Sequence, residues 1–191
     1  MVTGMGMVME KGLYAQLAGL LTYPQEDIKL RTDECIKALA SRTEQYPPEV
    51  GAELGRFQKD LEEMPLDDVQ GVYSYTFELS ADYSLDIGYH LYDGFKRANN
   101  LATVKTMYKE QGFPYDQIAK GELPDHLPVV LLFLDFVKEK DAQLMKDFRQ
   151  SFVILAMEKL NKNFEKNVKN LYRHLISAIY RILEKDVKEA K

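Results

Sequence analysis

The chain has 191 residues, of which 46% are hydrophobic and 29% are charged, and its formal net charge is -5 at pH 7. This length supports one sizeable core and falls short of what two independent domains need. The single cysteine, Cys35, excludes an internal disulfide and a zinc site built from several thiolates, and it favours a reducing compartment. The longest apolar run, residues 127–134, is far shorter than a membrane span, so we expect a cytoplasmic protein without stable membrane insertion.

The first half of the chain places apolar residues at helical spacing. Residues 1–8, rich in glycine and methionine, are expected to form a flexible lead-in to one domain over residues 9–191. Helices are then expected over residues 13–21, 28–39, 50–64 and 69–77. Prolines separate these stretches, and Asp67 or Asp68 can cap the fourth helix.

The second half continues the same periodicity. A polar loop at residues 80–84 precedes a helical stretch through Tyr89 and Tyr92, which breaks at Asp93-Gly94. A further helix carries residues 101–108 and ends at Gly112, with Pro114 just beyond it. Two or three more helices follow toward the C-terminus. The pattern predicts an all-α, single-domain bundle of about eight to ten helices.

One short motif stands out, Glu122-Leu123-Pro124-Asp125-His126-Leu127-Pro128. Pro124 disfavours a helical conformation at the residue before it, and Pro128 fits only the first turn of a helix, so the helix should begin near Asp125. A carboxylate there can accept hydrogen bonds from free amides and suits the positive end of the helix dipole. Capping explains Asp125 but gives His126 no role.

The charges are unevenly distributed. Between Lys59 and Lys96 there is no lysine or arginine, while nine acidic residues fall in that interval. The same interval holds seven of the 21 aromatic residues (12 Tyr and 9 Phe). An acidic surface would repel nucleic acid, whereas carboxylates beside aromatic rings suit an arginine side chain. The alternative is that these rings are ordinary core residues and the acids a solvated face.

Patterns typical of enzymes are absent from the sequence. There is no glycine-rich phosphate loop, nucleophile elbow or His-Glu-x-x-His helix, and His90, His126 and His174 have no ligand-like spacing. Asp125 and His126 are adjacent, and neighbouring helical side chains point about 100° apart, so they are poorly placed to act as an acid–base pair. We therefore expect no catalytic residues, no metal ligands and no cofactor.

Three sequence elements together match a known family. They are Tyr23-Pro24 after the first helix, Tyr73-x-x-x-Phe77 with Leu85, Tyr89-His90 and Asp93-Gly94-x-x-Arg97, and the motif at residues 122–128 followed by Leu131 and Phe133-Leu134. With them the chain resembles the redox-enzyme maturation chaperones, the NarJ-like nitrate reductase delta subunits and the TorD/DmsD-like proteins. It departs from them in having no tryptophan and in the residues Lys96 to Asn99.

The resemblance implies a TorD-like helical fold and a cytoplasmic chaperone that is not an enzyme. Such a protein would bind the N-terminal, often twin-arginine, leader of a molybdoenzyme catalytic subunit until its molybdenum cofactor is inserted, acting as a monomer or a dimer. The expected peptide-binding residues are Tyr73, Phe77, Glu78, Asp86, Tyr89, His90, Arg97, Glu122, Pro124, Asp125, His126 and Leu127. Two alternatives stay open: a structural subunit of a membrane-bound oxidoreductase, and a metal- or nucleotide-dependent enzyme.

Overall fold

The computed structural model describes residues 12–137 and 142–189, and the described chain is all-α, which confirms the predicted fold class. The α-helices are α1 (Leu13–Leu20), α2 (Ile28–Ala40), α3 (Pro48–Glu63), α4 (Leu66–Tyr73), α5 (Gly94–Glu110), α6 (Tyr115–Ala119), α7 (Leu127–Val137), α8 (Ala142–Phe148), α9 (Ile154–Glu165) and α10 (Tyr172–Glu189). The expected lead-in at residues 1–8 lies outside the described residues. None of the described helices is both long enough and apolar enough to cross a membrane.

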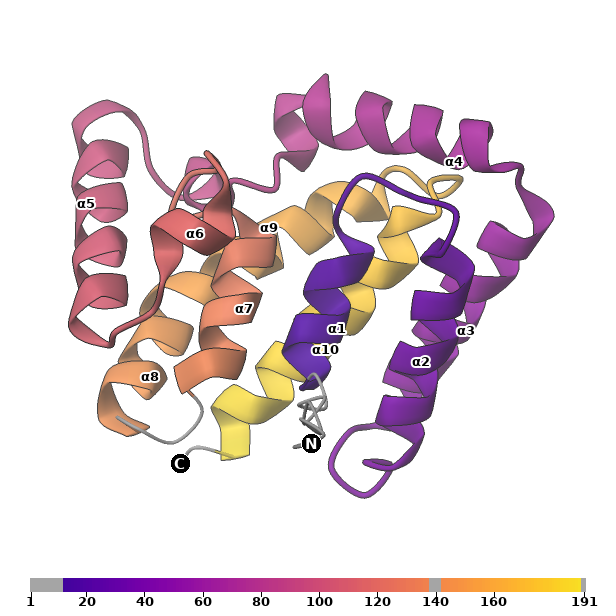
Figure 1. Cartoon of the computed structure of the whole chain (residues 1–191), viewed down its shortest axis with the longest axis horizontal. Helices are drawn as coiled ribbons and strands as arrows, with labels where there is room; N and C mark the ends of the chain where they lie inside the picture. The colour runs from indigo at the N-terminus through magenta and orange to yellow at the C-terminus, as the bar shows by residue number, and fades with distance from the viewer. Residues whose placement is uncertain (1–11, 138–141, 190–191) are drawn as a thin grey trace, which may run out of the picture.

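Four shorter helical turns complete the described elements. Two are π-helical, η1 (Ser74–Glu78) and η4 (Arg149–Val153), and each extends or precedes an α-helix without a break. Two are 3-10 turns, η2 (Ala81–Tyr83) and η3 (Ile87–His90), and they lie in the segment that links α4 to α5 across the upper part of the molecule (Figure 1).

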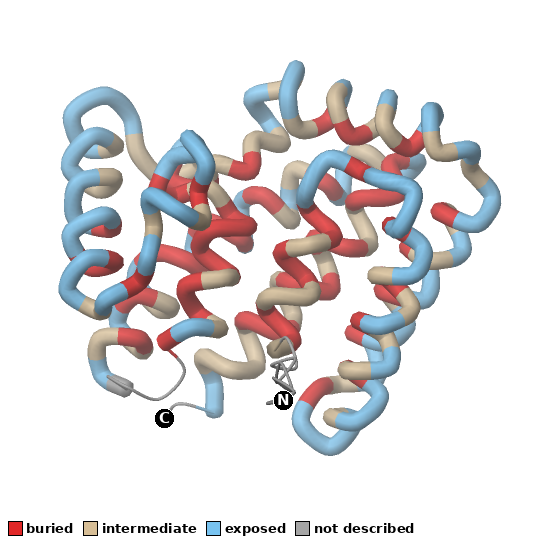
Figure 2. The backbone as a smooth tube through the Cα atoms, in the orientation of Figure 1, coloured by how far each residue is buried: buried red, intermediate tan, exposed pale blue. Residues whose placement is uncertain are grey.

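The core forms where α10 packs against α3 and α9, and where α1 lies between α7 and α2 (Figure 1). Helix α10 repeats apolar residues three and four positions apart, and this stripe is fully buried while the opposite side of the helix stays accessible. Figure 2 shows the same division, with buried positions on the inner faces of the central helices and exposed ones along α5. Burial of these stripes, rather than local propensity, holds such short helices in place.

Several helix starts follow from proline. Pro48 is the first residue of α3, where its missing amide proton costs nothing. Pro65 precedes α4 in an extended conformation, and neither aspartate makes a capping hydrogen bond there. The predicted cap from Asp67 or Asp68 is therefore wrong. Both aspartates lie in the first turn instead, where their charge still favours the helix dipole.

Three local predictions need correction. The helical stretch expected through Tyr89 and Tyr92 is only the 3-10 turn η3, and α6 was not predicted. Helix α7 begins at Leu127, two residues later than expected, and the His126 carbonyl accepts the hydrogen bond from the Val130 amide. Asp125 therefore precedes the helix, and its side chain is free to bind elsewhere.

Candidate functional site

The site is built on a short antiparallel bridge between two loops. The amide of Ile87 donates to the carbonyl of Asp125 at 3.0 Å, and the amide of Leu127 donates to the carbonyl of Leu85 at 2.7 Å. These two bonds flank Asp86 and His126 and hold the loop before η3 beside the start of α7. Residues that are 40 positions apart in the sequence thus become neighbours.

The bridge brings together five of the predicted residues, Asp86, Arg97, Glu122, Asp125 and His126, which we call the Asp86 cluster. Nδ1 of His126 lies 3.0 Å from Oδ1 of Asp86 and 3.7 Å from Oε2 of Glu122. Nη2 of Arg97, which α5 contributes, lies 3.4 Å from Oδ2 of Asp86 and 3.5 Å from Oδ2 of Asp125. The arginine therefore joins α5 to both loops.

Asp125 is the buried member of the cluster. Its side chain is 0% exposed, and its Oδ2 accepts a hydrogen bond from the Gly88 amide at 3.1 Å. A Cβ at position 88 would lie 2.5 Å from that oxygen, closer than atoms can approach, so only glycine fits here. The backbone carbonyl of the neighbouring Pro124 accepts a hydrogen bond from the buried Tyr108 hydroxyl at 2.7 Å.

The two aspartates have opposite electrostatic environments. Burial pushes the pKa of Asp86 upward, but the hydrogen bond and charge of His126 and the charge of Arg97 outweigh it, so this pKa lies below its ordinary value. Burial, together with the negative charge of Asp86, raises the pKa of Asp125 despite the opposing charge of Arg97. Asp86 is thus held firmly as a carboxylate.

The Arg97 guanidinium also lies over an aromatic ring, with its Cζ atom 5.8 Å from the ring centroid of Tyr89. Tyr89 is itself 46% exposed. Carboxylates on one side and an aromatic face on the other are the surroundings that the sequence predicted for an arginine. In this structure the arginine held by these groups is Arg97 of the same chain.

The predicted aromatic residues Tyr73 and Phe77 lie in a different set of contacts. The Tyr73 hydroxyl donates to the Leu21 carbonyl at 3.0 Å, and both rings pack edge-on against Tyr172 of α10. Burial raises the pKa of Tyr73 to about 12, with smaller contributions from the charges of Glu78 and Glu122. Among the described residues, no hydrogen bond, ion pair or ring contact joins these rings to Asp125 or His126. That they share one groove stays a prediction.

The remaining predicted residues divide by exposure. Glu78 and Glu122 are exposed, whereas Pro124 and Leu127 are buried. Nε2 of His90 lies 2.9 Å from the Ser84 carbonyl, and burial lowers the pKa of this histidine. Pro124, Asp125 and Leu127 are therefore buried beneath the accessible residues of the cluster and support them.

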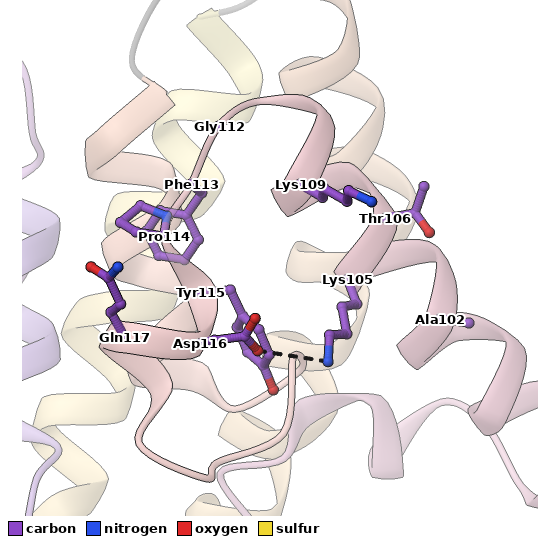
Figure 3. A pocket seen from close by; sticks show the side chains of 10 residues that line it. All are labelled: Ala102, Lys105, Thr106, Lys109, Gly112, Phe113, Pro114, Tyr115, Asp116 and Gln117. Carbon is purple, nitrogen blue, oxygen red and sulfur yellow. Dashed lines mark ion pairs between the residues drawn. The ribbon is translucent and has the colours of Figure 1, made fainter.

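A cavity of about 570 Å³ lies between α5 and α6 (Figure 3), and the hydroxyl of Tyr115, which lines it, donates to the backbone carbonyl of Glu122 at 2.6 Å. Nζ of Lys105 crosses its mouth to Oδ1 of Asp116 at 3.7 Å and lies 5.3 Å from the centre of the Tyr115 ring. None of the predicted site residues lines it. Of the two lysines that line it, Lys105 is thus already paired within the chain.

Sequence reasoning missed Gly88 and Asn100 at the site. Oδ1 of Asn100 lies 3.1 Å from where a Cβ of residue 88 would stand, so Asn100 and Asp125 both border the space beside Gly88. Gly88 could have been suspected because it lies inside a stretch expected to be helical, where a glycine lowers stability and a packing role would explain it. No comparable signal pointed to Asn100.

The motif at residues 122–128 lies within a region that matches a known protein family. A sequence profile of the family described as nitrate reductase delta subunit matches residues 43–177, which is most of the chain. The protein belongs to this family, which confirms the resemblance found in the sequence.

Two curated relatives give a closer comparison. Both are described as nitrate reductase molybdenum cofactor assembly chaperone NarJ, one from Escherichia coli strain K12 and one from Escherichia coli O157:H7. Each is 29% identical to this chain over 139 residues. The alignment covers 72% of this chain and 57% of each relative, so the chain spans little more than half the length of the curated relatives that it matches.

Proposed function

We propose that this protein is a cytoplasmic assembly chaperone without catalytic activity of its own. It would bind the N-terminal leader of the catalytic subunit of a molybdoenzyme and assist insertion of the molybdenum cofactor before export or membrane attachment. Membership of the delta subunit family supports this role, as does the similarity to relatives described as molybdenum cofactor assembly chaperones.

The leader-binding part of the proposal is supported by a group of exposed apolar side chains from η1 to the first turn of α5. The exposed fractions are 68% for Tyr75, 78% for Leu79, 46% for Tyr89 and 90% for Phe95. All four fall within residues 75–95, and exposed large apolar side chains are candidates for binding another protein. The leader is expected to place its apolar segment against them, as in helix-in-groove recognition.

The acidic residues near this segment suit the arginines of such a leader. Glu78 and Glu122 are exposed and could pair with a guanidinium directly. Asp125 is buried and already paired with Arg97, so its contribution would be to hold Asp86 and His126 in place. Affinity should be moderate, because a disordered leader loses conformational entropy on binding.

A direct test measures the fluorescence anisotropy of a labelled peptide with two consecutive arginines followed by an apolar segment. The matched peptide carries glutamines in place of both arginines. The proposal predicts that the arginine peptide binds and that a Leu79→Ser, Phe95→Ser double variant loses about tenfold or more in affinity, a change of about 1.4 kcal/mol.

A Leu30→Ser variant is the control, because Leu30 is also an exposed leucine (58%) but belongs to α2. It should bind the arginine peptide as the unmodified protein does. Equal affinity for both peptides would overturn the arginine pairing, and equal losses in the Leu30 and the Leu79, Phe95 variants would overturn the assignment of the apolar surface.

A further inference from the structure

We propose that Asp86, Glu122 and His126 form a binding site for one divalent transition-metal ion, with Zn²⁺ as the best-matched probe. One ligand atom from each residue lies within 4.8 Å of the other two. This site was not expected from the sequence, because Asp86 is 40 residues from His126 and the two meet through the bridge between their loops. The proposal does not depend on leader binding.

The separations between the ligand atoms fit a small coordination sphere. Zinc binds imidazole nitrogen and carboxylate oxygen at about 2.0–2.2 Å, so two ligands of a tetrahedral ion lie about 3.3 Å apart. Nδ1 of His126 is 3.0 Å from Oδ1 of Asp86 and 3.7 Å from Oε2 of Glu122, on either side of that value. Glu122 is the most exposed of the three, and it can move the few tenths of an ångström required.

The one proton that Nδ1 can carry serves only one of the two carboxylates that face it. Nδ1 carries at most one proton, which can bond to Asp86 at 3.0 Å but leaves the Glu122 oxygen at 3.7 Å, beyond hydrogen-bond distance. A metal ion in place of that proton would contact both oxygens at once. This distinguishes the cluster from an ordinary histidine–carboxylate pair.

The charge balance of the cluster favours a cation as well. Asp86, Glu122 and Asp125 supply three negative charges, and within the described residues Arg97 is the only arginine or lysine that pairs with them. A histidine that ligates a metal ion is neutral, so two negative charges would then remain, and a divalent ion would neutralise both. Arg97 contacts Oδ2 of Asp86, so Oδ1 stays available as a ligand.

The test is a titration of the purified, metal-stripped protein with Zn²⁺ by isothermal calorimetry, followed by competition with a chromophoric chelator. The site predicts one ion per chain. His126→Gln and Glu122→Gln should each weaken binding by about 10- to 100-fold or more, since each removes a ligand. With Co²⁺ in place of zinc, the visible absorption bands of a four-coordinate ion should appear in the unmodified protein and disappear in both variants.

His174→Gln is the matched control. This histidine also lies between two carboxylates, but Glu53 faces its Nδ1 atom at 2.6 Å and Asp60 faces its Nε2 atom at 3.9 Å, on opposite sides of the ring. Those carboxylates cannot join it around one ion, so zinc binding should be unchanged. Because Glu122 is exposed, its variant should fold normally, as circular dichroism can verify. Absence of one-to-one binding, or binding that survives Glu122→Gln and His126→Gln, would overturn the proposal.

Discussion

The Nδ1 atom of His126 and the Oδ1 atom of Asp86 lie 3.0 Å apart and join two loops that the sequence separates by 40 residues. Because the pKa of Asp86 lies below its ordinary value, the carboxylate is ionised and can only accept, so Nδ1 carries the hydrogen. The histidine that capping could not explain therefore belongs to the contact between the two loops.

The Asp86 contact predicts a pH-dependent stability. Since the pKa of Asp86 is lowered below 3.8 in the folded chain, its ionised form stabilises the fold above about pH 4, and this contribution is lost as the pH falls through the folded pKa. Asp86→Asn should cost about 1–2 kcal/mol at pH 7. Urea denaturation of both proteins from pH 7 to pH 3 should show the difference shrinking at the acid end. A difference that is constant over this range would contradict the assigned role of the charge.

Gly88 should tolerate no side chain. Gly88→Ala would place a Cβ 2.5 Å from the buried Asp125 carboxylate, so we expect a loss of about 1–3 kcal/mol in the free energy of unfolding. Gly71→Ala is the control, because Gly71 lies within α4 with no atom within 4 Å of the added Cβ. That variant should gain about 0.5–1 kcal/mol, since alanine favours a helix over glycine. Equal effects of the two changes would show that the contact with Asp125 has no importance.

The pair between His174 of α10 and Glu53 of α3 should stabilise the central helices. Nδ1 of His174 lies 2.6 Å from the Glu53 carboxylate, and the two side chains are only 12% and 13% exposed. His174→Ala should cost about 1–3 kcal/mol, because it leaves a poorly solvated carboxylate without this partner. Arg56 pairs with the same carboxylate from the exposed side, and Arg56→Ala should cost less than about 1 kcal/mol. Thermal denaturation measures the stability lost in each variant. A larger loss for Arg56→Ala would show that Arg56, and not His174, is the more important partner of Glu53.

Substitutions of Tyr73 and Leu79 should have different effects. The first should lower stability, and the second should weaken peptide binding. Tyr73→Phe removes the hydrogen bond to the Leu21 carbonyl and should cost about 1 kcal/mol of unfolding free energy. Leu79→Ser changes a side chain that is 78% exposed and should leave stability within about 0.5 kcal/mol while weakening leader binding. Chemical denaturation and the anisotropy assay, applied to both variants, give the two readouts. A Leu79 variant that unfolds easily would show that this side chain belongs to the core.

The helices could be predicted because their apolar residues repeat at helical spacing and proline marks their ends. Helix α3 shows this clearly, with four buried apolar residues on one stripe between Pro47-Pro48 and Pro65. The segment around η3 misled the same reasoning, since Tyr89 and Tyr92 are spaced as in a helix. Here the backbone follows the close approach of Gly88 to Asp125 and the bridge to the loop before α7, and not the local apolar spacing.

The motif at residues 122–128 could be recognised, but its contacts could not. Adjacent residues Asp125 and His126 face different partners, Gly88 with Arg97 for the first and Asp86 for the second. Those partners depend on how two loops and α5 come together in three dimensions, and no local pattern encodes that arrangement. The family resemblance named the residues without giving their geometry.

The two backbone bonds of the bridge also have a kinetic consequence. The amide protons of Ile87 and Leu127 are held by carbonyls across the loop junction, and that of Gly88 is held by the Asp125 side chain. None of the three can exchange with solvent deuterium unless the two loops separate, so their exchange should report one common free energy of opening. Separation of the loops would also take Asp86 away from His126. The lifetime of this junction therefore sets how long the cluster on its surface persists.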